Sequence, residues 1–434
     1  MWWIFGSLLE LFSRAEIGTL LLLFFYYFFL YCTIFWMLVL LENRKRIFFD
    51  PRPRRLPSIS IIIPAYNEEE HIARAIDSCL NLKYPKDKLE IIVVNDGSTD
   101  RTEEICRKYE AKKLIKLINK PNSGKANSLN LGISLARGEL ICCLDADSYF
   151  DEEALLRMVG YFNDKEVAAV TAALKVSSSN TILEKIQHLE YLFSVYLRKM
   201  FSFLDCIYVI PGPGSIYRKE VLQKVGGFDP NNLVEDTDIA FRIQRLGYKI
   251  ENSVNAVVYT HIPRSFRGLL KQRIRWYTGY LENVLGKHRD LIFFKGSPNL
   301  GMFLLPSNFL WLFSLNYLLI FSVYELFGYL YGGFRNLFLI GFDLGILLRS
   351  IRFGIGLNFF SSFFLIFLGF SSIVILISLK VGREKVGLKE RYSNYIAYIA
   401  LYFILISFFW LASTVFLIYR KVRGGGGWKG EKVR

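Results

Sequence analysis

The sequence predicts an α/β domain with a mostly parallel sheet, inserted between transmembrane α-helices. Three observations support this fold class. Strand-like and helix-like stretches alternate between residues 58 and 262, a buried apolar run at 140–144 leads into Asp145 and Asp147, and charge-free stretches flank the domain. The chain has 434 residues, of which 52% are hydrophobic and 16% aromatic, a composition typical of a membrane protein.

The charge balance and the cysteines narrow the class further. The formal net charge is +15, and a basic balance in such an apolar chain indicates contact with membrane lipids at the cytoplasmic surface. No basic stripe accompanies a nucleic-acid motif, so no nucleic-acid partner is expected. None of the six cysteines has Cys-x-x-Cys spacing, which predicts reduced, buried thiols and no cysteine metal site (Cys32, Cys79, Cys106, Cys142, Cys143 and Cys206).

The N-terminal region reads as a membrane anchor. Residues 1–16 form an aromatic interfacial lead-in, and residues 17–41 carry no charge and are long enough to cross a ~30 Å hydrocarbon core. The basic linker at 42–57 follows and contains the stiff, proline-rich stretch 51–57. Positive residues on this side predict an outside N-terminus and a cytoplasmic α/β domain in a multi-pass protein of the plasma membrane.

The α/β domain is expected at residues 58–262. Short β-branched or apolar runs predict its strands, and stretches of helical periodicity between them predict its helices. Ser98 or Thr99 is expected to cap the second helix. The strands are predicted at 59–63, 89–94, 114–118, 140–144 and 167–176, and the helices at 68–82, from the cap to about 110, 124–136, 181–203 and 236–246.

The last third of the chain is predicted to return to the membrane. Residues 263–300 are expected to form amphipathic interface helices, one of them at 265–285, and 301–420 a C-terminal transmembrane bundle. Residues 334–348 are apolar but short and contain Asp343, so the whole chain has either four or five spans. A basic, flexible tail is expected at 421–434. The clear spans of the bundle are predicted at 302–324, 357–379 and 396–419.

Asp145 and Asp147 are the first candidate functional residues. Ligands of open α/β sheets bind beyond the carboxyl ends of the strands, and residues i and i+2 share one side. Two hard oxygen ligands on one side suit Mg²⁺ or Mn²⁺, which could hold a nucleoside diphosphate. Two acids in an ordinary surface turn would give the same short pattern.

Three more loops follow predicted strands or open helices. Tyr66 could stack on a base and Glu68 could accept from a ribose, although acids at a helix start are common. Asp96 could read the imino edge of uracil, although Gly97 and its neighbours also make an ordinary turn. Lys125 and the backbone amides at its helix start suit phosphate, with a surface lysine as the alternative.

Two further stretches complete the set. Asp236, in a run of acids opening a helix, is a candidate general base for a sugar hydroxyl. Gln272 and Arg275 lie three residues apart on one helix face, so Arg275 could meet a diphosphate while Trp276 stacks on a sugar ring. A basic amphipathic helix on the membrane surface would show the same residues.

In this order, the stretches resemble the membrane-embedded family 2 glycosyltransferases, which include poly-N-acetylglucosamine, hyaluronan, chitin and cellulose synthases. The similarity runs from about residue 15 to the C-terminus, and the layout looks most like the bacterial poly-N-acetylglucosamine synthases. It implies a GT-A-type fold for the cytosolic domain. The matching residues are Pro64-Ala-Tyr-Asn-Glu, Asn95-Asp-Gly-Ser, Gly124-Lys-Ala-Asn, Asp145-Ala-Asp, Glu235-Asp236 and Gln272-Arg-Ile-Arg-Trp276.

The resemblance implies a role for each matching residue. Asp236 would be the catalytic base, and Asp145 and Asp147 would bind the divalent metal. Gly212, Gly214, Glu235 and Trp276 would contact the acceptor, and His261 is either structural or a third metal ligand. The nucleotide-sugar would be bound by Pro64, Tyr66, Glu68, Asp96, Lys125, Asp145, Asp147, Gln272, Arg275 and Trp276.

The resemblance therefore predicts an inverting, UDP-sugar-dependent transferase with Mg²⁺ or Mn²⁺ as cofactor. It would add a sugar, with N-acetylglucosamine as the best guess, to a growing β-linked polysaccharide and move the polymer across the membrane. Intramembrane Asn308, Asn316 and Asn358 could line the path, or simply bond neighbouring helices. Two alternatives remain: a non-processive transferase acting on a lipid-linked acceptor, and a nucleotide-sugar-binding membrane protein without catalysis. The oligomeric state is not predicted.

Overall fold

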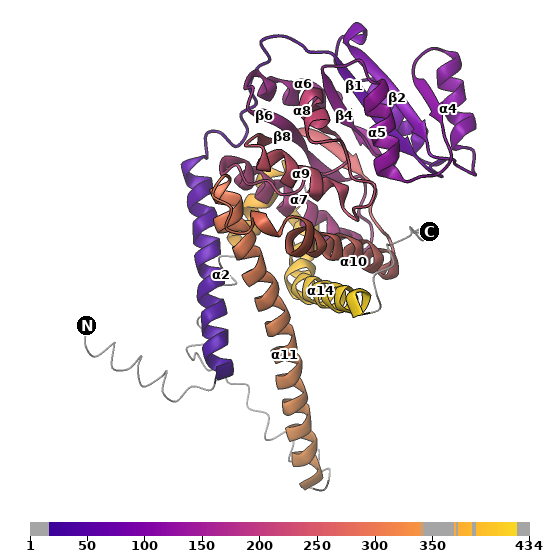
Figure 1. Ribbon diagram of the computed structural model, residues 1–434. Helices are drawn as coiled ribbons and strands as arrows, with labels where there is room; N and C mark the ends of the chain where they lie inside the picture. The colour runs from indigo at the N-terminus through magenta and orange to yellow at the C-terminus, as the bar shows by residue number, and fades with distance from the viewer. Residues whose placement is uncertain (1–16, 340, 342–368, 370–371, 384–387, 423–434) are drawn as a thin grey trace. The chain divides into compact units, whose positions relative to one another are not determined.

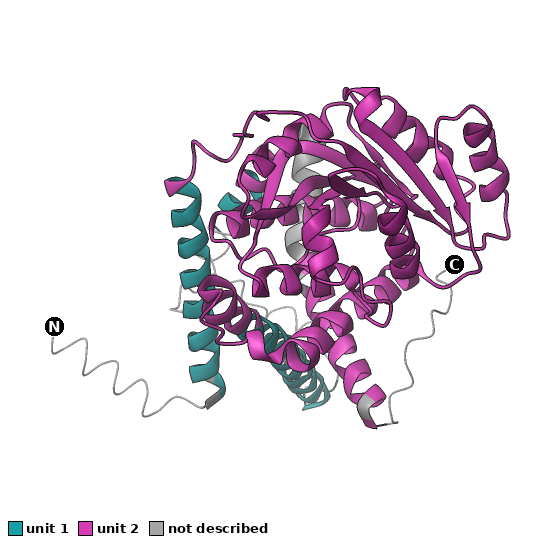
Figure 2. Cartoon of the chain, turned by 45° about the horizontal axis from the view of Figure 1, so that its top comes forward, with its two compact units in different colours: residues 1–41, 309–376 teal, residues 42–308, 377–434 magenta. Residues whose placement is uncertain are grey.

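The chain divides into two compact units in a computed structural model that describes residues 17–339, 341, 369, 372–383 and 388–422. One unit comprises residues 1–41 and 309–376, and the other comprises 42–308 and 377–434 (Figure 2). The second unit contains an eight-stranded sheet in the order β3-β2-β1-β4-β7-β6-β8-β5. The predicted lead-in at 1–16 and most of the tail at 421–434 lie outside the described residues.

The sheet is mostly parallel, as the sequence predicted. β1 pairs in parallel with β2 and β4, β2 with β3, and β6 with β8. β7 runs antiparallel between β4 and β6, and β5 runs antiparallel to β8. The strands are β1 (Ile59–Ala65), β2 (Leu89–Asn95), β3 (Lys116–Asn119), β4 (Leu140–Cys143), β5 (Ser148–Phe150), β6 (Val167–Val176), β7 (Ser215–Arg218) and β8 (Lys249–Thr260).

Helices cover both faces of the sheet because its central strands are apolar on both sides (Figure 1). In β1, Ile59, Ile61 and Ile63 belong to one core cluster and Ile62 to the other. α3, α4 and α6 supply buried residues to the first cluster, and α5, α8 and α9 to the second. The helices are α3 (Ile72–Leu80), α4 (Thr102–Ala111), α5 (Lys125–Leu135), α6 (Ala154–Val159), α8 (Lys219–Lys224) and α9 (Glu235–Arg245), with short 3-10 turns at Lys86–Lys88 and Gly160–Asn163.

The predicted cap of the second helix is wrong. α4 begins at Thr102, and Ser98 and Thr99 instead bond to the loop after β1. Asn67 donates its backbone N–H to Ser98 Oγ and accepts from the Thr99 N–H at 2.8 Å. The two loops that follow β1 and β2 are therefore locked together at the carboxyl edge of the sheet.

The basic linker packs against the sheet. Asp50 accepts hydrogen bonds from Ser253 and Asn255 of β8, and the Arg54 backbone N–H donates to Asn163. The carbonyl of Pro51 would lie 1.6 Å from a Cβ at position 160, so only glycine fits at Gly160. The chain after the first apolar helix is thus tied to the domain.

Three long helices complete the second unit. α7 (Ile182–Phe203) begins with a capping box between Thr181 and Glu184, as its predicted start allows. α10 (Phe266–Glu282) corresponds to the predicted interface helix. α14 (Leu388–Val422) contains the span predicted at 396–419 and packs on α10, where Tyr277 and Trp410 stack 4.0 Å apart at an angle of 4° (Figure 1). Short π- and 3-10 segments follow α10 at Asn283–Lys287, Arg289–Leu291 and Asn299–Leu304.

In the first unit, α2 (Ile17–Glu42) packs against the part of α11 (Leu305–Leu339) that belongs to this unit. The rings of Phe29 and Trp311 lie 4.6 Å apart, and Tyr317 donates to the Gly18 carbonyl. Among the described residues, two stretches are long and apolar enough to cross a membrane, Leu20–Glu42 and Asn299–Leu339. These are the first predicted span and the stretch that contains the second.

The number of spans stays a prediction. Most of 334–348 and of the predicted span 357–379 lies outside the described residues, as does Asn358. Shorter apolar helices occur at Ser372–Val381 and Ile404–Arg420. Asn308 of α11 donates to the Tyr280 hydroxyl of α10 at 3.0 Å, a bond between two helices. Asn316 donates to the Leu312 carbonyl within its own helix. A role of either residue in a polymer path stays a prediction.

Candidate active site

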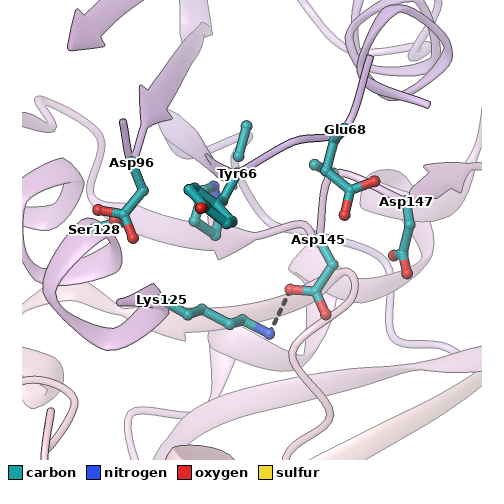
Figure 3. Close-up of a pocket in the computed structure, with 10 residues that line it drawn as sticks. Tyr66, Glu68, Asp96, Lys125, Ser128, Asp145 and Asp147 are labelled. Carbon is teal, nitrogen blue, oxygen red and sulfur yellow. Dashed lines mark ion pairs between the residues drawn. The ribbon is translucent and has the colours of Figure 1, made fainter. Parts of the chain in front are cut away.

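The candidate site is a cavity of about 230 Å³ at the carboxyl ends of β1, β2 and β4. Parallel strands bring the loops that follow them to one edge, which is why motifs far apart in the sequence meet here. In Figure 3, Lys125 reaches toward Asp145, with Glu68 and Asp147 beside it and Asp96 near Ser128. The cavity is lined by Pro64, Ala65, Tyr66, Glu68, Asp96, Lys125, Ser128, Asp145, Ala146 and Asp147.

Carboxylates gather on one side of this cavity. Burial, followed by the charges of Asp147 and Asp145, raises the pKa of Glu68 to about 7. Burial and Asp145 also raise the pKa of Asp147. Mutual repulsion of this kind would be relieved by a bound cation.

The donor chemistry fits Mg²⁺ or Mn²⁺, because both prefer oxygen ligands and commonly bind one or two carboxylates together with substrate phosphates. Among the described residues, no group of three or more His, Cys, Asp or Glu side chains is arranged to hold an ion. Asp145 and Asp147 stay the predicted ligands of such an ion.

His261 lies next to this cluster. Its Nδ1 lies 2.8 Å from the Asp147 carbonyl oxygen, and its ring stacks on that of His71 with centroids 4.2 Å apart. The contact orients the ring through Nδ1 and is compatible with both roles that the sequence allowed.

Asp96 lines the cavity, but its carboxylate already accepts three hydrogen bonds. The donors are Lys120 and the backbone N–H groups of Ser123, at 2.9 Å, and Gly124, at 2.8 Å. These bonds fix the loop that leads into α5. Contact between Asp96 and a uracil base stays a prediction. It would use the lone pairs of the carboxylate that these three bonds leave free.

Lys125 connects the carboxylates of the cavity with those of α9. Its Nζ lies 2.6 Å from Asp145 Oδ1 and 3.6 Å from Glu235 Oε1. Burial alone would lower the pKa of Lys125, but Asp145, Glu235 and Asp236 together raise it above its ordinary value. The lysine is therefore a fixed positive charge between two groups of acids.

Asp236 has the properties of a general base. It lies in the first turn of α9, where acids are favourable to the helix dipole, and its Oδ1 accepts from the Thr237 N–H. Burial and the neighbouring Glu235 raise the pKa of Asp236 to about 6, while Lys125 and Arg275 act in the opposite direction. A carboxylate tuned close to neutral pH is suited to removing a hydroxyl proton.

The two glycines predicted on the acceptor side have different surroundings. A Cβ at Gly212 would lie 2.8 Å from Lys125 Nζ and 3.2 Å from Asp145 Oδ1, so the backbone there borders the charged centre. Gly214 has φ +72°, and a Cβ would lie 2.4 Å from Val258 Cγ2. Packing and backbone conformation thus explain the glycine at 214, while the acceptor contacts of both stay predictions.

The predicted α10 residues do not line the cavity. Arg275 donates to the Leu233 carbonyl at 3.0 Å just before α9, and its charge acts on Asp236. Gln272 has a buried Oε1 without a hydrogen-bond partner among the described residues. The Trp276 ring lies 4.4 Å from the guanidinium of Arg273. Of the three, Arg275 lies near Asp236, and the contacts of all three with the donor stay predictions.

Sequence reasoning missed the pair that holds α10 against α7. Arg273 is 2% exposed and donates to Glu190 at 2.8 Å. Nothing in the local pattern signals a partner so far away along the chain, and the sequence analysis assigned one helix face only to Gln272 and Arg275.

Comparison with known proteins defines the class. Residues 60–226 match the family described as Glycosyl transferase family 2. The mostly parallel sheet and the acidic cavity at its carboxyl edge lie in this segment or directly beside it. This segment of the chain is therefore similar to the family 2 glycosyltransferases.

Individual relatives lie within the same class. The chain is 35% identical over 238 residues to the "Probable glycosyltransferase YdaM" of Bacillus subtilis, covering 52% of this chain and 56% of that protein. It is 33% identical over 235 residues to a "Poly-beta-1,6-N-acetyl-D-glucosamine synthase" of Staphylococcus epidermidis, covering 54% of this chain and 57% of that protein. The matched regions thus span just over half the length of these relatives.

Among solved structures, a mannosyltransferase from Pyrobaculum calidifontis in complex with GDP-Man and Mn²⁺ has a TM-score of 0.48. It is 25% identical and covers 60% of this chain and 74% of that one.

Proposed function

We propose that the chain is an inverting membrane glycosyltransferase that moves N-acetylglucosamine from UDP-N-acetylglucosamine to a growing β-linked polysaccharide. The observation that carries the proposal is the charge arrangement around Lys125, which lies between the acidic cavity and the half-buried Asp236. The match to poly-β-1,6-N-acetylglucosamine synthases supports the choice of sugar and product.

The chemistry follows from this arrangement. Asp236 accepts the proton of an acceptor hydroxyl as that oxygen forms a bond to C1 of the donor sugar. The bond from C1 to the diphosphate oxygen breaks on the opposite face, and UDP leaves, so an α-linked donor gives a β-linkage. Lys125 and Arg275 offset the negative charge that develops on the diphosphate.

A divalent cation fits the same scheme. Asp145 and Asp147 would hold it, and it would supply further positive charge to the diphosphate. The raised pKa values of Glu68 and Asp147 support a cation at this edge of the cavity. UDP release measured with each ion separately decides between Mg²⁺ and Mn²⁺.

The membrane setting is also part of the proposal. Two stretches are apolar and long enough to span, and the basic residues that follow α2 favour a cytoplasmic glycosyltransferase unit and an outside N-terminus. A polymer made inside would leave beside α10 and the C-terminal apolar helices. Inverted vesicles test this step. Polymer protected inside the vesicles would support translocation, and polymer that stays accessible outside them would count against it.

The direct test is UDP release by the purified full chain in detergent, with a panel of UDP-sugars and with Mg²⁺, Mn²⁺ or a chelator. We expect release with UDP-N-acetylglucosamine, loss of release with the chelator, and a ladder of lengthening products by mass spectrometry. Asp236→Asn should retain UDP binding and lower turnover by at least ~100-fold, because it removes the base. Glu220→Gln, on α8 and 76% exposed, is the matched control.

Other outcomes would redirect the proposal. Single additions without a ladder would favour the transferase that acts on a lipid-linked acceptor. UDP binding without release for any sugar would favour a binding protein, and full turnover of Asp236→Asn would remove the base assignment.

A further inference from the structure

α7 carries an arginine that none of the roles above uses. The Nη2 of Arg198 donates to Ser194 Oγ one turn earlier, at 3.0 Å. Its Nη1 is inaccessible to solvent and has no hydrogen-bond partner among the described residues. No carboxylate of the described residues forms an ion pair with Arg198 either. Buried donors are almost always paired, and an unpaired one in a native structure requires an explanation.

The surroundings of Arg198 connect it to the proposed base. The segment between α7 and β7 contains Tyr208 and then Ile210, whose N–H donates to the Asp236 carbonyl at 3.3 Å. Burial lowers the pKa of Arg198 to about 10, while Tyr208, Asp236 and Tyr191 act against that change. The guanidinium therefore lies within electrostatic reach of the base and of two phenol groups, without a salt-bridge partner of its own.

A second unpaired group lies on the adjoining helix. Gln272 Oε1 on α10 is a buried acceptor without a partner in the described part of the chain, and α10 is joined to α7 by the Arg273–Glu190 pair. The donor on α7 and the acceptor on α10 do not bond to each other. A sugar presents both hydroxyl donors and oxygen acceptors, so one bound saccharide could satisfy both groups.

Aromatic rings border the same region. The ring of Tyr208 lies 5.5 Å from that of Tyr280 in an edge-to-face arrangement, and Trp276 belongs to the same helix as Gln272. Aromatic faces pack well against the apolar C–H surface of a sugar, and the Tyr O–H and Trp N–H groups can form hydrogen bonds with it. Arg198 and the segment 208–210 lie close to Asp236, and Tyr208 adds an aromatic ring to this region.

We propose that Arg198 is an acceptor-binding residue, whose free Nη1 donates to an oxygen of the terminal acceptor sugar beside Asp236 while Gln272 accepts from one of its hydroxyls. The proposal rests on the proposed transferase function and adds a specific acceptor contact to it. Arg198 holds the sugar in place and keeps its own protons, so it takes part in no bond change.

The test separates the acceptor from the donor. UDP release by the full chain in detergent is measured against the concentration of a β-1,6-linked N-acetylglucosamine oligosaccharide, and UDP binding with Mn²⁺ is measured by calorimetry. Arg198→Met should raise the acceptor KM about 10- to 100-fold, as expected for loss of a charged hydrogen bond, and leave the UDP Kd unchanged. Arg267→Met, an exposed arginine of α10, is the matched control and should change neither value.

Arg198→Lys keeps the charge without the planar fork and should give a smaller rise in acceptor KM. Thermal unfolding in detergent shows whether Arg198→Met is folded. If it is not, Arg198→Lys becomes the variant that tests the proposal. An unchanged acceptor KM in a folded variant overturns the proposal, and so does a parallel loss of UDP affinity. If the wild-type chain itself neither releases UDP nor extends the oligosaccharide, the proposed function has failed instead.

Discussion

Asp236, the proposed base, shows how the surroundings of one residue change its pKa. Its ordinary pKa is 3.8, and burial together with Glu235 raises it to about 6. A carboxylate whose pKa is raised by folding is more costly to keep ionised, so the folded protein gives up some stability at neutral pH to have a stronger base. A half-buried base close to neutrality can exchange its proton with a sugar hydroxyl and still be ionised at pH 7.

The pH dependence of turnover tests this environment. The base must be unprotonated, so kcat/KM should rise with pH through about 6 and level off above it. Glu235→Gln removes the carboxylate that raises the Asp236 pKa and should move the acid limb to lower pH. Initial rates of UDP release between pH 5 and 8 measure the acid limb of the wild type and that of Glu235→Gln. An acid limb that stays in place in Glu235→Gln would contradict the assignment.

At the scale of the element, α9 is held by a buried ionic cluster two residues beyond the base. Asp238 is fully buried and pairs with Arg242 at 2.6 Å, with Lys287 at 2.6 Å and with His288 at 2.8 Å. Burial alone would raise the Asp238 pKa, but hydrogen bonds from His288 and Lys287 hold it well below its usual range. The cluster ties α9 to the segment after α10 and so fixes the direction in which Asp236 points.

Asp238→Asn should therefore lower the free energy of unfolding by about 3 kcal/mol, the usual effect of removing one member of a buried ion pair. The folded pKa of Asp238 is depressed, so its stabilisation is present above the ordinary carboxyl pKa and is lost as the pH falls. The gap between wild type and variant, measured by thermal unfolding in detergent, should narrow on acidification.

Asp290→Asn is the control for that prediction. Asp290 is 60% exposed and pairs with Arg245 at 2.8 Å, so its loss should change the free energy of unfolding by less than about 1 kcal/mol. Equal effects of the two substitutions would show that burial of the Asp238 cluster does not matter.

At the scale of the whole second unit, residues 42–308 and 377–434, the C-terminal helix α14 packs on the helix that carries three of the predicted site residues. Besides the Tyr277–Trp410 stack, Arg420 pairs with Glu282 at 2.7 Å and Thr278 bonds to the Ser413 carbonyl. Each contact joins α14 to α10, the helix that carries Gln272, Arg275 and Trp276. The end of the chain thus supports residues that its middle contributes to the site.

Removal of residues 388–434 should abolish UDP release and lower the melting temperature, because α10 loses these contacts. Removal of only 423–434, which leaves α14 intact, should preserve both. Trp410→Ala is the point variant and should lower turnover with less effect on stability than the long deletion. Full activity after the long deletion would show that α14 has no supporting role.

The sequence by itself determined the central strands and the donor side of the site. β-branched and apolar runs such as 59–63 can only be buried, and parallel strands bring the following loops to one edge, so Tyr66, Lys125 and Asp145 could be placed together in advance. The tertiary structure decided what local pattern could not. The polar residues Glu251, Asn252, Ser253 and Asn255 made the strand β8 hard to recognise in the sequence. In the fold, Asn252 donates to Thr171, and Ser253 and Asn255 donate to Asp50, so distant segments supply partners for these donors.

The same holds for the Asp236 side of the site. The Glu190–Arg273 pair, the unpaired groups of Arg198 and Gln272 and the raised pKa of Asp236 all depend on which helices meet. Burial and long-range charge are properties of the packed chain. The residue types of a motif are therefore readable from the sequence, but their electrostatic state is fixed only when distant segments exclude water from them.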